Sequence, residues 1–187
     1  TAVVEGSLTP DHAASTPVCQ AAKAAMRPWL DAAGNPSSLH QQGREAEAAI
    51  DEAREVISNR LECLFGEVVF TSGATEAANL AIVGAALGRK DARRNRVLFS
   101  AAEHPCVLQT EPILSKLGVQ AQTVPVDRYA RTDLDALEKM MGDDVLLVAA
   151  MHANNEVGTV QRARPIADIA HRHGALFFCD SVQTFGW

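Results

Sequence analysis

The sequence lacks the features that mark a membrane-spanning, secreted or metal-binding protein. No apolar run among its 187 residues approaches the roughly 20 that a membrane span needs. The segment 1–7 lacks the basic-then-apolar layout of a signal peptide, so we expect a cytoplasmic protein with no membrane partner. The four cysteines are far apart and form no CxxC pair, which argues against a metal site and against a disulfide scaffold.

Basic residues are also sparse. The net charge is −6, and lysine occurs only at positions 23, 90, 116 and 139. The one local group of arginines, at positions 89, 93, 94 and 96, is predicted to be a solvated loop, so no nucleic-acid partner is expected. The GxxxxGK pattern of a nucleotide-binding P-loop is missing.

The sequence does contain two kinds of apolar pattern that alternate along the chain: apolar residues at helical spacing, and short continuous apolar runs. Helical spacing of apolar residues predicts a helix over 40–61, and an earlier helix with Pro17 in its first turn and Pro28 kinking or ending it. Short apolar runs predict buried parallel strands, and helical patterns fill the gaps between them. The strands are expected at 68–70, 97–99, 119–124, 145–150 and 175–178, and the helices at 76–87, 107–117, 134–141 and 166–173. This alternation indicates an α/β fold, in one domain or part of one.

Polar groups follow several of these strands. The segment 68–76 runs from a strand through small residues into a helix, whose free N–H groups favour an anion such as phosphate. The alternative is simple capping, with Gly73 as the N-cap and Glu76 at the third helical position. Asp180 could hold a cationic ring nitrogen or a metal, or it could merely cap a turn.

Two further polar segments, 151–158 and 103–105, also come directly after strands. The carboxyl ends of parallel strands meet at one edge of a sheet, where ligands of α/β proteins bind. Four such strand ends together favour a binding site more than any one of them does.

Six motifs, in order along the chain, carry a resemblance to a known family. They are 11–17 (DHAASTP), 34–40 (GNPSSLH), 70–76 (FTSGATE), 103–104 (EH), 152–158 (HANNEVG) and 180–183 (DSVQ). Together they resemble the cysteine desulfurase branch of the class V aminotransferases, which are fold-type I enzymes dependent on pyridoxal phosphate. The resemblance implies a three-layer α/β large domain with a mostly parallel sheet, incomplete in this chain. Residues 1–16 would be an N-terminal segment and 17–187 the first part of that domain.

The resemblance also implies roles for single residues. Ala74 and Thr75 would bind the cofactor phosphate. His104 would stack on the pyridine ring and take part in proton transfer. Asp180 would pair with the pyridine nitrogen and keep it protonated. Asn155 and Gln183 would hydrogen-bond near the ring hydroxyl, with Asn155 also placed to meet the substrate carboxylate.

Other parts of the family pattern are not found. The Schiff-base lysine of the Ser-x-His-Lys motif, the sulfur-accepting cysteine and the substrate-binding arginine belong to family positions beyond residue 187. Thr9 and Pro10 replace the usual aromatic-Leu pair before Asp11, and the segment 61–66 lacks the usual Gly and Pro. Cys106 and Cys179 are predicted to be buried rather than to replace the missing nucleophile.

The predicted activity is therefore that of a cysteine desulfurase, converting L-cysteine to L-alanine and passing the sulfur to a cysteine persulfide. It would need a second polypeptide that supplies the lysine and the cysteine, in a homodimer-like assembly with a sulfur acceptor or iron–sulfur scaffold protein. The alternatives are a selenocysteine or cysteine lyase, another class V enzyme such as an epimerase or transaminase, or a non-catalytic partner subunit. We further expect strand 68–70 to lack a neighbour and strand 175–178 to expose an apolar edge that a second chain completes.

Overall fold

The computed structural model describes residue 13 and residues 16–186. The chain divides into two compact units, Thr1–Phe70 and Thr71–Trp187, and each is described by itself. Most of the motif at 11–17 lies outside the described residues, as does nearly all of the expected segment 1–16. The domain boundaries 1–16 and 17–187 stay a prediction.

The first unit is helical. It contains α1 (Gln20–Leu30), α2 (Gln41–Leu61) and the short 3-10 helix η1 (Phe65–Glu67). The predicted bounds of α2, 40–61, differ from the observed ones by one residue, because His40 is the N-cap of the helix. Its Nδ1 accepts a hydrogen bond from the Gly43 amide at 3.2 Å. Helix α1 begins later than expected, with Cys19 as its N-cap, and runs two residues beyond Pro28, which therefore does not end it.

The strand predicted at 68–70 is wrong. These residues follow η1 as extended chain with no strand partner in the described part of the molecule, as their expected lack of a neighbour implied. The Arg54 guanidinium instead donates from Nε to the Val68 carbonyl at 3.3 Å and lies 5.4 Å from the centre of the Phe70 ring. An apolar run adopts the extended backbone of a strand, but only a hydrogen-bonded neighbour makes it part of a sheet.

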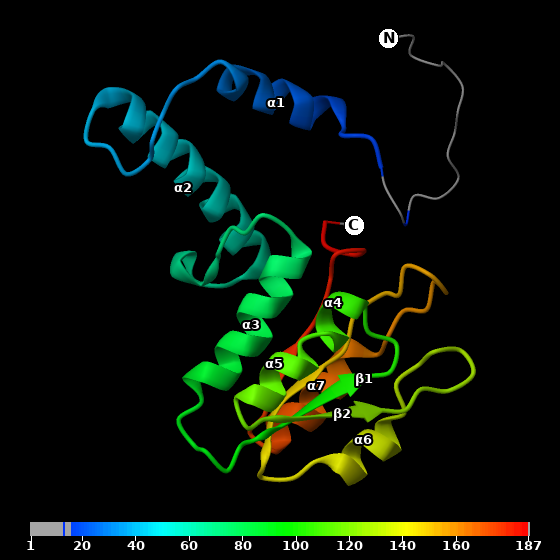
Figure 1. Cartoon of the computed structure of the whole chain (residues 1–187). Coiled ribbons are helices and arrows are strands. Elements are labelled where there is room, and N and C mark those ends of the chain that lie inside the picture. Colours follow the sequence, from blue (N-terminus) through cyan, green and yellow to red (C-terminus); the bar gives the residue numbers. More distant parts are fainter. Residues whose placement is uncertain (1–12, 14–15, 187) are drawn as a thin grey trace. The chain divides into compact units, whose positions relative to one another are not determined.

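The second unit has a four-stranded sheet, and all of its strand pairs are parallel (Figure 1). The strand order is β2-β1-β3-β4. The elements are α3 (Ala74–Gly88), β1 (Arg96–Ser100), α4 (Pro105–Leu108), α5 (Glu111–Lys116), β2 (Gln120–Val124), α6 (Leu134–Met140), β3 (Val145–Ala149), α7 (Ala163–Arg172) and β4 (Leu176–Phe178). The helix predicted over 107–117 is split into α4 and α5. A second helix starts there because Pro112 suits a first turn, where its missing N–H costs nothing.

Alternating residues of the two central strands point to opposite faces of the sheet. Val97 and Phe99 of β1 pack in a core with α3, α4 and α5, whereas Leu98 packs in a second core with α6 and α7. Helices therefore cover both faces, which confirms the α/β, parallel-sheet fold predicted from the sequence. At the edge, β4 pairs only with β3 among the described strands, and Leu176 is 53% exposed. None of the helices in the described part of the chain is long and apolar enough to span a bilayer.

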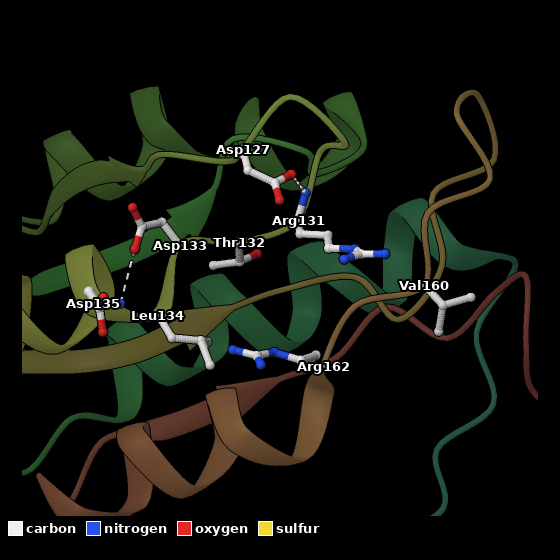
Figure 2. A pocket seen from close by; sticks show the side chains of 8 residues that line it. All are labelled: Asp127, Arg131, Thr132, Asp133, Leu134, Asp135, Val160 and Arg162. Atoms are coloured by element: carbon white, nitrogen blue, oxygen red, sulfur yellow. Dashed lines mark hydrogen bonds between the residues drawn. The ribbon is translucent and has the colours of Figure 1, made fainter.

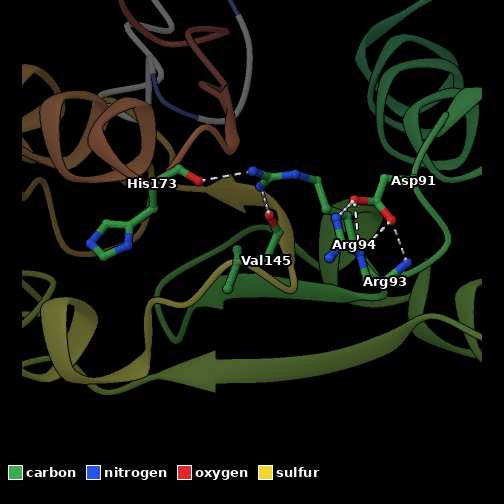
Figure 3. A network of polar contacts seen from close by, with 5 residues as sticks. All are labelled: Asp91, Arg93, Arg94, Val145 and His173. Carbon is green, nitrogen blue, oxygen red and sulfur yellow. Dashed lines mark hydrogen bonds and ion pairs between the residues drawn. The ribbon is translucent and has the colours of Figure 1, made fainter.

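The arginine group is only partly solvated: Arg93 is exposed, whereas Arg94 and Arg96 are half-buried. Arg94 donates to the carbonyl of Val145 at 2.6 Å and to the carbonyl of His173 at 3.1 Å, as Figure 3 shows. It thereby joins the start of β1 to the start of β3 and to the end of α7. Gly174 leaves the space for this side chain, because a Cβ there would lie 2.8 Å from an Arg94 nitrogen. Arg96 also pairs with both carboxylate oxygens of Asp144 at 2.7 Å.

We expect Arg94→Met to lower the free energy of unfolding by about 2–3 kcal/mol, because it leaves the buried Val145 carbonyl without its charged donor. Arg93→Met is the matched control, since the exposed Arg93 side chain pairs with Asp91 at the surface (Figure 3). Urea unfolding followed by circular dichroism measures both. Equal losses in the two variants would show that the contact of Arg94 with β3 does not stabilise the fold.

Candidate functional site

The strand order alone indicates where a ligand binds. The chain leaves β1 towards β2 on one side, whereas β3 and β4 lie on the other side. The strand order therefore reverses between β1 and β3, and at the carboxyl edge of such a sheet this is the point where a ligand crevice is expected. The segments at this edge are 101–104 after β1, 150–155 after β3 and 179–183 after β4.

Glu103 connects two of these segments. Its side-chain Oε1 accepts a hydrogen bond from the Met151 amide at 2.5 Å, so the turn after β1 is joined to the end of β3. The residue is only 6% exposed, and its buried Oε2 has no hydrogen-bond partner among the residues that the structure describes. Burial raises the pKa of Glu103 to about 7, and the negative charge of Asp180 adds to this rise, whereas the Met151 amide opposes it.

His104 follows directly and caps α4. Its Nδ1 accepts from the Cys106 amide at 3.1 Å, which assigns the proton of the neutral ring to Nε2. Helix α4 contacts α3, and the Thr75 side chain lies close enough to Cys106 to lower the pKa of its thiol. Burial raises the pKa of the Cys106 thiol, and the charges of Asp180 and Glu103 raise it further. A thiol of this kind is a poor nucleophile at neutral pH.

The start of α3 offers free backbone donors. Gly73 is the N-cap and makes no side-chain cap, and the Cβ position at Gly73 faces open space. Glu76 at the third position accepts from the Ser72 amide at 2.7 Å and from the Ser72 hydroxyl at 2.6 Å. These hydrogen bonds lower the pKa of Glu76. The capping alternative is thus realised through Glu76, and the Ala74 and Thr75 amides remain at the exposed first turn.

Asp180 lies at the end of the β4 segment and is half-buried. Its carbonyl accepts from the His152 amide at 2.8 Å, and its Oδ1 accepts from the Val182 amide at 3.0 Å. The turn-capping alternative is therefore also realised, through one of the two carboxylate oxygens. Gln183 is half-buried in the turn that follows.

The two adjacent asparagines differ. The Asn154 side chain is bound on both sides: Oδ1 accepts from the amides of Glu156 and Val157 in its own turn, and Nδ2 donates to the Ala102 carbonyl in the turn after β1 at 3.0 Å. The half-buried Asn155 amide has no hydrogen-bond partner within the described residues. Asn155 is thus the one of the pair whose side chain remains available to a ligand.

Comparison with known proteins identifies the family. The model of the "Aminotransferase class-V" family matches residues 10–187. The chain belongs to the class V aminotransferase family. Its relatives include the cysteine desulfurase IscS of Dictyoglomus turgidum, 41% identical over 94% of this chain and 45% of that protein. A putative cysteine desulfurase IscS 1 of Bacillus subtilis is also 41% identical, over 94% of this chain and 46% of that protein.

Solved structures agree with the sequence comparison. The chain superposes on SspA in complex with cysteine with a TM-score of 0.86 and 36% identity, over 94% of this chain and 50% of that one. It superposes on a NifS-like protein with a TM-score of 0.87 and 34% identity, over 93% and 48%. The chain thus spans about half the length of the relatives it matches. Class V aminotransferases and cysteine desulfurases, which are transferases, depend in general on pyridoxal phosphate.

The class V fold in this chain brings several of the predicted site residues to one edge. Thr75 and Asp180 both interact with Cys106, two residues from His104, and Asn155 follows β3 at the same edge. The sequence analysis named Glu103 only as the neighbour of His104. The signal that it matters was a carboxylate three residues after a buried strand, where burial of a charge is costly.

A hollow of about 620 Å³ lies elsewhere, between the loop before α6 and residues 160–162 (Figure 2). Charged side chains line it, among them Asp127, Arg131, Asp133 and Arg162. None of the six predicted site residues lines this hollow, so its size does not make it the cofactor site.

The raised pKa of Glu103 predicts a pH-dependent stability. Between its ordinary value of 4.5 and about 7, the folded protein binds more protons than the unfolded chain. The free energy of unfolding should therefore fall as pH rises through this range, by at most about 3 kcal/mol. Glu103→Gln removes this part of the slope, as urea unfolding at pH 5, 6, 7 and 8 would measure. Glu111→Gln, an exposed control on α5, should retain the slope, and a retained slope in Glu103→Gln would contradict the assignment.

Proposed function

We propose that this chain carries the pyridoxal phosphate-binding site of a cysteine desulfurase. The observation that carries the proposal is the meeting of an anion-binding helix start, an imidazole and a carboxylate at the crevice between β1 and β3. Each group matches one part of the cofactor: the phosphate, the face of the ring and the ring nitrogen. The donor set therefore fits the cofactor chemically.

In this site the start of α3 binds the phosphate through the Ala74 and Thr75 amides and the Thr75 hydroxyl. The helix is fifteen residues long, so its dipole adds to the attraction for a dianion. Helix α3 packs against α4, which carries His104 as its N-cap, and Thr75 lies near Cys106 of α4. The phosphate and the ring are thereby bound by two elements that contact each other.

Asp180 binds the ring nitrogen and keeps it protonated. The cofactor then supplies an electron sink for the substrate carbon, which is its established chemical role. His104 lies over the ring and moves the substrate proton through its imidazole. Asn155 and Gln183 hydrogen-bond the ring hydroxyl region, and Asn155 also meets the substrate carboxylate.

The whole reaction would take L-cysteine to L-alanine and pass its sulfur to a cysteine of the enzyme and on to a protein acceptor. It needs a lysine that bonds the cofactor, a nucleophilic cysteine and a substrate-binding arginine. We propose that these belong to the sequence that corresponds to the rest of the relatives, in the same polypeptide or in a second one. The assembled enzyme would be a homodimer in the cytoplasm.

Thr75→Val should weaken the binding of pyridoxal phosphate about fivefold to thirtyfold, because it removes one hydroxyl donor to a charged group, about 1–2 kcal/mol. Fluorescence titration with pyridoxal phosphate measures the dissociation constant. Thr123→Val, on the exposed edge strand β2, is the matched control and should not change it. An unchanged constant in Thr75→Val would refute the phosphate site.

Asp180→Ala should reduce desulfurase turnover more than tenfold, a rise in the barrier of at least about 1.4 kcal/mol, because the ring nitrogen loses its anionic partner. The assay follows sulfide and alanine from L-cysteine, with the chain joined to the complementary part of a cysteine desulfurase. Asp168→Asn, exposed on α7, should retain full activity. Retention of more than a tenth of the activity in Asp180→Ala would overturn the role of Asp180.

A further inference from the structure

The Glu103 carboxyl spans the crevice between the central strands. Its Oε1 holds the Met151 amide at 2.5 Å, across 48 residues of sequence. A second contact runs in the opposite direction, from Asn154 Nδ2 to the Ala102 carbonyl at 3.0 Å. These two hydrogen bonds fix the turn after β1, and with it His104, against the end of β3.

The two contacts differ in how they respond to pH. The Asn154 amide is neutral at every pH, whereas Glu103 is an acid with one buried oxygen unpaired. Burial raises the pKa of Glu103 to about 7. The groups around it are the Asp180 carboxylate and the thiols of Cys106 and Cys179, with His104 next to it in the chain. The charge of the Asp180 carboxylate opposes ionisation of Glu103, and within the described part of the chain no cation offsets it.

We propose that Glu103 is a positioning residue, which as the neutral acid holds the His104 turn against β3 and releases it on ionising. The neutral form retains an acceptor for the Met151 amide at little electrostatic cost. The ionised form leaves a negative charge buried beside Asp180 with one oxygen unpaired, which is costly enough to favour hydration. Water reaches the carboxylate only when the turn at 101–104 moves away from Met151. The connection of this turn to cofactor binding rests on the function proposed above.

The first test uses the protein without cofactor. Hydrogen exchange of the Met151 amide, corrected for its intrinsic rate, should show a protection factor that falls about tenfold from pH 6 to pH 8. In Glu103→Gln the side chain stays neutral and keeps its acceptor oxygen, so the protection factor should be the same at both pH values. Glu111→Gln is the matched control and should behave as the unmodified protein does.

A direct titration supports the exchange measurement and needs no variant. The ¹³C resonance of the Glu103 carboxyl should titrate with the same midpoint as the loss of Met151 protection. Constant protection in the unmodified protein, an equal fall in Glu103→Gln, or two different midpoints would each overturn the proposal. The proposal requires that the protection factor of the Met151 amide falls only in proteins that retain Glu103.

The second test adds pyridoxal phosphate as the probe. If the closed turn is needed for binding, the dissociation constants of the unmodified protein and of Glu103→Gln should agree at pH 6. At pH 8 the unmodified protein should bind about tenfold more weakly than the variant. Tighter binding by the unmodified protein at pH 8 would overturn the proposal, because Glu103 would then act as a second anion for the ring. No binding by either protein at any pH would refute the proposed cofactor site, whereas the exchange result would still decide the role of Glu103.

Discussion

The parallel pairing of β1 with β3 is the constraint on which the second unit depends. It places two strands that are about fifty residues apart side by side, with their carboxyl ends at one edge. At the opposite edge Arg94 and Arg96 join the starts of the same strands through hydrogen bonds to Val145 and Asp144. At the carboxyl edge the connections diverge, and Glu103, Asn154 and Asp180 meet there because the strands end there.

The sequence predicted the periodic elements well. Helix α2 and strands β1, β3 and β4 have clear apolar patterns, and burial on a sheet or a helix face is what such patterns encode, whereas the pattern of β2 is weaker. The segment 68–70 has the same pattern and is no strand, because pairing depends on a neighbour that the pattern does not describe. Pro28 misled for a related reason: near a helix end it removes only one hydrogen bond, and the helix continues past it.

The side-chain contacts were harder to predict than the elements. A group of arginines between a helix and a strand is equally compatible with solvent and with buried carbonyls, and only the packed structure shows Arg94 bonded to Val145 and His173. The opposite held for Asp180 and Glu76. Asp180 and the segment that contains Glu76 each had two interpretations, a cap and a ligand contact, and the structure shows the cap in both.

The distance along the chain between Glu103 and Met151 has a consequence for folding. The start of α3 can form early, because its hydrogen bonds join neighbours in the sequence. The bond across the crevice requires β1 and β3 to have paired first, and the Asp180 segment requires β4 to have joined β3. Closing such long loops is entropically costly, so contacts of this kind form late. The start of α3, which would bind the phosphate, therefore forms before the strand ends that would bind the ring of the cofactor. A ligand that binds at that stage would contact only a general anion site.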